Sequence, residues 1–81
     1  MKTKNLLEAP PNKALEILEI NAGDAARMRL ISMGIHIGDW VMKYNENSWC
    51  PVLVKNITLN SSKIAIGKIL AAKILVRHEK G

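Results

Sequence analysis

Turn-forming residues interrupt the sequence so often that the chain can build only short strands and one short helix. Gly34 and Gly38 flank a histidine, the polar stretch "NENS" occupies residues 45–48, and "NSS" occupies residues 60–62. Between these breaks lie short segments rich in aliphatic and β-branched residues, which are typical of strands joined by tight turns. The 81 residues fit a single domain, residues 1–81, with a small hydrophobic core.

The segment "RMRLISMGIHIGDWV", residues 27–41, predicts a helix that stops, turns and leads directly into a strand. Asp24 precedes this helix and is expected to cap it, because an aspartate oxygen can accept bonds from the first free amides. Gly34 fits the left-handed residue that ends many helices. Gly38-Asp39 follows as a tight turn. The paired glycines therefore predict a corner, with His36 exposed in it, rather than a site.

The remaining segments predict about five short strands, with the helix inserted after the first. The expected strands cover residues 13–20, 40–44, 49–59, 63–66 and 73–77. Imperfect alternation in the first of them predicts a β-bulge, or a strand buried on both faces at one end. Residues 1–12 are expected to be a lead-in segment, because Pro10-Pro11 excludes regular structure there. This pattern indicates a mainly β fold, a small and strongly bent antiparallel barrel.

Composition favours a soluble protein of a reducing compartment, and so a cytoplasmic one. Cys50 is the single cysteine, whereas a small disulfide-stapled domain needs an even set. The N-terminal residues lack an apolar core of signal-peptide length, and no apolar run approaches a membrane span. The net charge is +5, and all of the excess lies in residues 47–81. Such a half can face a membrane surface, a nucleic acid or an acidic protein, or be simply a solvated face.

Four stretches, taken in order, resemble the FeoA family of small proteins encoded beside the bacterial ferrous-iron transporter. "RLISMGIHIGDWV", residues 29–41, resembles the family's arginine-leucine, leucine-glycine, proline-glycine signature, with Ile37 in place of the proline. The pair Leu15 and Leu18 matches apolar positions of the first strand. Pro51 to Val54 matches the proline-started central strand, and "KIAIGKILAAKILV", residues 63–76, matches the closing strand, alanine-bearing turn and strand.

The resemblance covers roughly residues 6–77 and implies an SH3-like barrel of about five strands with one short helix after the first. It also implies a cytosolic accessory protein that binds or regulates FeoB, a membrane transporter of ferrous iron with a cytosolic GTPase domain. The family supplies no catalytic residues. Similar SH3-like domains sit at the C-terminus of metal-dependent repressors of the DtxR type. A module serving metal-dependent transcriptional regulation or nucleic-acid binding therefore remains the alternative.

Neither a catalytic centre nor a metal site is expected. The sequence has no Ser/His/Asp set, no paired-carboxylate motif and no phosphate-binding glycine loop, so it does not predict an enzyme. The candidate metal ligands do not have the spacing of a metal site, and we expect no cofactor. These candidates are Cys50, His36 and His78, with Asp39 or Glu79.

Protein binding is the function with a physical route, and its candidate residues are Trp49, Tyr44, Arg27 and Arg29. Trp49 and Tyr44 lie across one predicted hairpin, where an exposed aromatic pair indicates an interface. The two arginines can face outward from the helix and bond acidic groups of a partner. Alternatively, Trp40 and Tyr44 belong to the core, Trp49 caps the barrel and the arginines are only solvated. Nucleic acid is not expected, because the few aromatics are not interleaved with basic residues.

Overall fold

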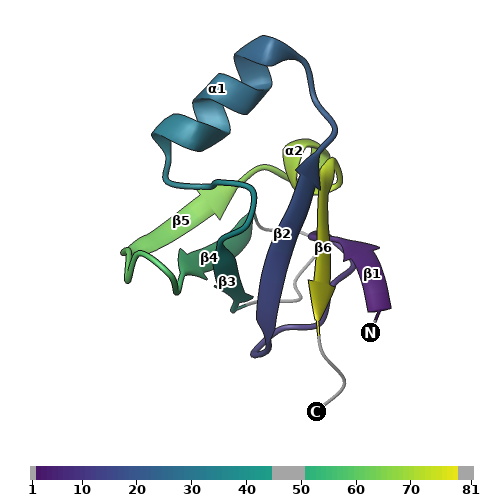
Figure 1. Ribbon diagram of the computed structural model, residues 1–81, viewed down its shortest axis with the longest axis vertical. Helices are drawn as coiled ribbons and strands as arrows, with labels where there is room; N and C mark the ends of the chain where they lie inside the picture. Colours follow the sequence, from purple (N-terminus) through teal and green to yellow (C-terminus); the bar gives the residue numbers. More distant parts are fainter. Residues whose placement is uncertain (1, 45–50, 79–81) are drawn as a thin grey trace.

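The computed structural model describes residues 2–44 and 51–78, which form one antiparallel sheet of six strands with two helices (Figure 1). The strands are β1 Lys2–Asn5, β2 Ala14–Ile20, β3 Trp40–Lys43, β4 Val52–Asn56, β5 Lys63–Ile66 and β6 Ile74–His78, and the helices are α1 Asp24–Ser32 and α2 Lys68–Ala71. The strand order is β1-β6-β2-β3-β4-β5, so β1 and β5 are the two edges. The mainly β fold with a short helix after the first long strand is confirmed.

Strand β1 brings the number of strands to six rather than about five. It lies in the segment that the sequence indicated as a lead-in, and it pairs antiparallel with β6, from Lys2 opposite His78 to Asn5 opposite Leu75. The pairing continues into Leu6, whose amide donates to the Ile74 carbonyl at 2.8 Å and whose side chain is fully buried. The N-terminal residues are thus held by the opposite end of the chain.

Strand β2 contains the expected irregularity. Its register against β6 shifts between Ile17 and Glu19, which is the signature of a β-bulge. Because the bulge inserts one residue, Leu15, Ile17 and Ile20 all point into the core although their spacing is not strictly alternating. The broken alternation in the sequence is therefore the local expression of a bend in the longest strand.

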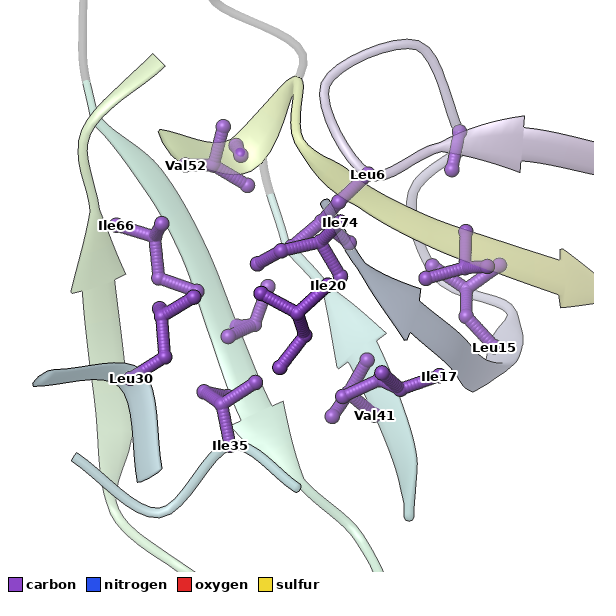
Figure 2. Close-up of a cluster of buried hydrophobic side chains, with 14 residues drawn as sticks. Leu6, Leu15, Ile17, Ile20, Leu30, Ile35, Val41, Val52, Ile66 and Ile74 are labelled. Atoms are coloured by element: carbon purple, nitrogen blue, oxygen red, sulfur yellow. The ribbon is translucent and has the colours of Figure 1, made fainter. Parts of the chain in front are cut away.

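The core is built from aliphatic side chains that the sheet encloses from several sides (Figure 2). Ile20 of β2 lies near its centre, and Leu30 of α1 points toward Ile66 of β5. Each fully buried side chain of this size contributes roughly 1.5–3 kcal/mol through the apolar surface it removes from water. Helix α1 is therefore attached to the sheet mainly by Leu30, its only fully buried residue in the described helix.

A lysine lies on the inward face of β3. Lys43 is 4% exposed, and its ammonium group donates to the carbonyl oxygens of Leu7 at 2.7 Å and Ala9 at 2.9 Å. The backbone carbonyl of Lys43 accepts the amide of Asn12 at 2.8 Å. A buried charge of this kind is tolerated only when its donors are satisfied, and here it fixes the turn between β1 and β2 against β3.

Helix α1 starts differently from the expectation and ends as expected. Gly23 is the N-cap residue and makes no side-chain cap bond, whereas Asp24 is the first helical residue. The cap predicted for Asp24 is therefore wrong, although its charge still favours the positive end of the helix. At the other end Gly34 has φ 98°, its amide donates to Ile31, and the Ile35 amide donates to Leu30 at 2.9 Å. This is the Schellman arrangement.

The corner after α1 is held by Asn56, which is fully buried. Its Nδ2 donates to the Gly34 carbonyl at 2.7 Å and to Asp39 Oδ2 at 2.8 Å, and its Oδ1 accepts the Leu59 amide at 3.0 Å. The predicted tight turn is present, because Gly38 has φ 94° and the Asp39 amide donates to the His36 carbonyl. One side chain of β4 thus joins the end of α1, the turn before β3 and the turn after β4.

Replacing Asn56 with Ala is expected to lower the free energy of unfolding by about 2–3 kcal/mol, because buried polar groups of Gly34 and Leu59 lose their partner. The matched control is Asn21→Ala, since Asn21 is exposed and a surface truncation usually changes stability by less than about 0.5 kcal/mol. Urea unfolding followed by circular dichroism measures both. Equal stability of the two variants would contradict the role of Asn56.

Candidate binding groove

A groove of about 860 Å³ lies between α1, together with Met33 just after it, and the corner where β5 meets α2. One wall is made of small residues, Ala22 and Gly23 before the helix and Ala25 and Ala26 within it. The facing wall runs along the chain from Ala65 of β5 to Leu70 of α2. The volume is within the range of sites that hold a ligand of moderate size or a short peptide.

The groove runs along α1, whose residues Ala25, Ala26 and Arg29 line it. Leu30 and the Schellman turn hold the C-terminal part of the helix, and a Cβ at Gly34 would lie only 3.7 Å from Ile64 Cδ1 of β5. The N-terminal part carries alanines, whose side chains are too short to reach β5 and α2. The space between the helix and the corner of β5 and α2 is therefore left open. Figure 1 shows α1 above these two elements.

The described lining of the groove is apolar with a basic rim. It includes three cations, Arg29 of α1, Lys68 of α2 and Lys73 after it, and no acidic residue. Ile69 of α2 also lines it and is 81% exposed, the highest value among the large hydrophobic side chains described. Exposed apolar surface beside several positive charges indicates an interaction site. The ligand that fits it is apolar and also carries negative charge.

The structure separates the residues predicted to bind a partner. Arg29 lines the groove, whereas Arg27 is exposed on α1 outside that lining. Tyr44 follows β3, is half-buried and is also outside the groove lining, with Lys63 Nζ 5.0 Å from its ring centroid. Trp49 lies outside the described residues, so its role stays a prediction.

The alternative that Trp40 and Tyr44 are core residues is not what the fold shows. Along β3 the inward positions are Val41 and Lys43, while Trp40 is half-buried on the opposite face. The guanidinium carbon of Arg77 lies 5.8 Å from the Trp40 ring centroid, and Arg77 Nε also bonds Glu16 Oε1. Trp40 thus lies under Arg77, and Tyr44 lies under Lys63, both on the outer face of the sheet.

The candidate metal ligands are only partly brought together. His36 Nδ1 lies 2.9 Å from Asp39 Oδ2, and the His36 side chain is 41% exposed. This pair belongs to the corner that Asn56 holds. His78 ends β6, and Cys50 and Glu79 lie outside the described residues. Across residues 2–44 and 51–78, no three His, Cys, Asp or Glu side chains gather in a way that could hold a metal ion.

Of the two helix arginines that the sequence predicts to bind a partner, only Arg29 lines the groove. Ile69 and Lys73 also line it, and the sequence does not single them out. Their signal is the segment "GKILAAK", residues 67–73, in which an isoleucine stands between lysines in a helix too short to bury it. That α2 faces α1 across some 40 residues of chain follows only from the fold.

The antiparallel sheet and the inserted helix define a mainly β, SH3-like fold. The chain matches the model of the FeoA domain over residues 4–78 and belongs to the FeoA family. It is 45% identical over 60 residues to a protein of Methanocaldococcus jannaschii that is provisionally named Fe(2+) transport protein A, an alignment that covers 74% of this chain and 68% of that protein.

Solved structures agree with this assignment. The crystal structure of an iron uptake regulatory protein, FeoA, matches with a TM-score of 0.81 and 28% identity, covering 98% of this chain and all of the other. A FeoA-like protein of Clostridium acetobutylicum matches with a TM-score of 0.80 at 18% identity, covering 100% of this chain and 92% of that one. A manganese-dependent transcriptional repressor in complex with manganese matches with a TM-score of 0.85 at 14% identity, covering 98% of this chain and 38% of the repressor. The last two likenesses show the fold alone.

No helix among the described residues is both long enough and apolar enough to cross a membrane.

We expect the groove to be dispensable for stability. Ile69→Ser should change the free energy of unfolding by less than about 0.5 kcal/mol, because its side chain is 81% exposed. Leu30→Ala, on the core side of α1, should cost about 2–5 kcal/mol through the cavity that it leaves. Urea unfolding of both variants measures the difference. A large loss in the Ile69 variant would mean that this residue is structural.

Proposed function

We propose that this chain is a non-catalytic accessory protein of ferrous iron uptake, which acts in the cytoplasm by binding a FeoB-type transporter. The observation that carries the proposal is the groove between α1 and α2, apolar within and basic at its rim, in a chain of the FeoA family. A protein that works by contact needs an exposed complementary surface rather than a reactive group. This groove supplies such a surface without weakening the core.

The supporting chemistry is the combination of Ile69 and the cations beside it. An apolar side chain that is almost fully exposed becomes favourable when a partner covers it. The cations Arg29, Lys68 and Lys73 attract an acidic segment and orient it before it docks.

The alternative, a module for metal-dependent transcriptional regulation or nucleic-acid binding, is not favoured. The likeness to the manganese-dependent repressors is at 14% identity and covers 38% of the repressor chain, so it concerns the fold only. Nucleic-acid binding needs a basic surface that tracks phosphates, often with aromatic rings for stacking. The rings of Trp40 and Tyr44 are instead engaged by the cations of this chain.

Arg29→Glu should weaken binding to the FeoB-type transporter of the same genome about tenfold. Charge reversal at the groove rim removes one attraction and adds a repulsion with an acidic partner. Biolayer interferometry with the purified transporter in nanodiscs measures the dissociation constant. The salt concentration is about 150 mM, because exposed charges more than about 8 Å apart are then largely screened and only close contacts contribute. The matched control is Arg27→Glu, which makes the same change on the same helix outside the groove and should stay within twofold of the wild type.

Two results would contradict this proposal. The absence of saturable binding by the wild-type chain would remove the transporter as the partner. Equal weakening by the two arginine variants would place the contact elsewhere on α1. Trp49→Ala is measured in the same way. If Trp49 contributes to the contact as predicted, this variant should stay folded and bind the transporter more weakly than the wild type.

A further inference from the structure

The outer edge of β5 forms part of the groove and is unpaired in the described sheet. β5 is last in the strand order and pairs only with β4 there, with Ile64 opposite Val54 and Ile66 opposite Val52. The Tyr44 amide donates to the Leu53 carbonyl, so the backbone N–H and C=O groups of Leu53 point toward β3. The backbone groups of its neighbours in β4, Val52 and Val54, therefore point toward β5. In an antiparallel pair the bonded positions alternate.

This alternation assigns each backbone group of β5 a direction. Ile64 and Ile66 exchange bonds with β4, and consequently Lys63 and Ala65 aim their amide and carbonyl groups away from the sheet. Ala65 lines the groove. In Figure 1, β5 lies between β4 and α1. The groove therefore offers directed hydrogen-bonding groups along one wall as well as apolar surface.

We propose that the groove binds its partner by strand addition: an extended segment from the cytosolic side of the transporter pairs antiparallel or parallel with the outer edge of β5, beneath α1. An edge strand can accept such a segment because its free amides and carbonyls repeat at the spacing of the next strand. This inference rests on the proposed function and specifies how the contact is made.

The two edges of the sheet differ in a way that singles out β5. The edge strand β1 has the sequence "KTKN", which is wholly polar. The edge strand β5 has the sequence "KIAI" and lies beside apolar lining. Lysines on an edge commonly prevent unwanted pairing, and in β5 only the first residue is a lysine. The small Ala65 leaves the middle of the strand open to approach.

The charge of the groove rim selects the occupant. Arg29, Lys68 and Lys73 require an incoming strand with acidic residues near its ends and small or aliphatic residues between them. A second copy of this chain does not meet that requirement, because joining two β5 edges would bring two basic rims together in molecules of net charge +5. A segment of four to six residues matches the length of β5.

Amide hydrogen exchange tests the pairing directly on the wild-type chain. The probes are overlapping 12-residue peptides that cover the cytosolic segments of the transporter, added to the labelled full chain and followed by NMR. A bound peptide should slow exchange at Ala65, and at Lys63, by at least tenfold. Ile64 and Ile66 should change little, because their amides already bond β4.

Two proline variants provide the matched test against the intact transporter. Ala65→Pro removes one outward amide of β5 without removing a bond to β4, and it should weaken binding at least tenfold. Thr3→Pro removes an outward amide from β1, since Leu6 bonds the Ile74 carbonyl and the bonded positions alternate. The Thr3 variant should bind like the wild type. Circular dichroism confirms that each variant is folded.

The outcomes separate this inference from the proposed function. If the transporter binds the wild type but Ala65 gains no protection and Ala65→Pro binds equally well, strand addition is wrong and the accessory role stands. If Ala65 is already protected in the free chain in a concentration-dependent way, the edge pairs with a second copy and the inference is also wrong. If neither the transporter nor any peptide binds, both proposals fall.

Discussion

The side chain of Asn56 is the constraint on which the arrangement of this small domain depends. Its amide nitrogen bonds the carbonyl that ends α1 and the carboxylate before β3, while its amide oxygen accepts an amide of the turn after β4. The first two partners lie 22 and 17 residues before Asn56 in the sequence, and the third lies three residues after it. A buried amide with satisfied partners has one geometry in which all its bonds form, so it specifies the corner more sharply than aliphatic packing does.

The position of α1 follows from that corner, and the groove follows from the position of α1. The Asn56 bonds fix the C-terminal end of the helix against β4, and Leu30 packs its middle toward Ile66. At its first turn the chain has Gly23, Ala25 and Ala26, none of which is buried. The helix residues that line the groove are therefore small or exposed, and the groove runs along α1 as far as Met33.

Local chemistry was sufficient to predict some of these features from the sequence, and long-range pairing accounts for those that it missed. Glycine adopts positive φ without steric cost, and Gly34 and Gly38 stand where a helix stop and a turn need it, so both features were predictable. Strand β1 was not, because its polar residues carry no strand signal and its order comes from β6 at the other end of the chain. Lys43 likewise reads as a surface residue until two carbonyls of the first turn surround it. For the site, Arg29 was predictable from an exposed helix face, but Ile69 and the edge of β5 depend on the strand order.

The outer edge of β5, which is unpaired in the described sheet, and the exposed Ile69 both represent stabilising free energy that the free chain does not use. A chain of 81 residues buries a modest share of its surface, and each apolar side chain left outside the core is stabilisation that the fold forgoes. Folding alone gives no reason to keep an isoleucine 81% exposed beside three cations. Covering Ile69 and pairing the backbone of Ala65 by the same incoming strand would recover both contributions at once. Because these contributions would be realised only in a complex, they would add to affinity without adding to the stability of the free domain, as the proposed accessory role requires.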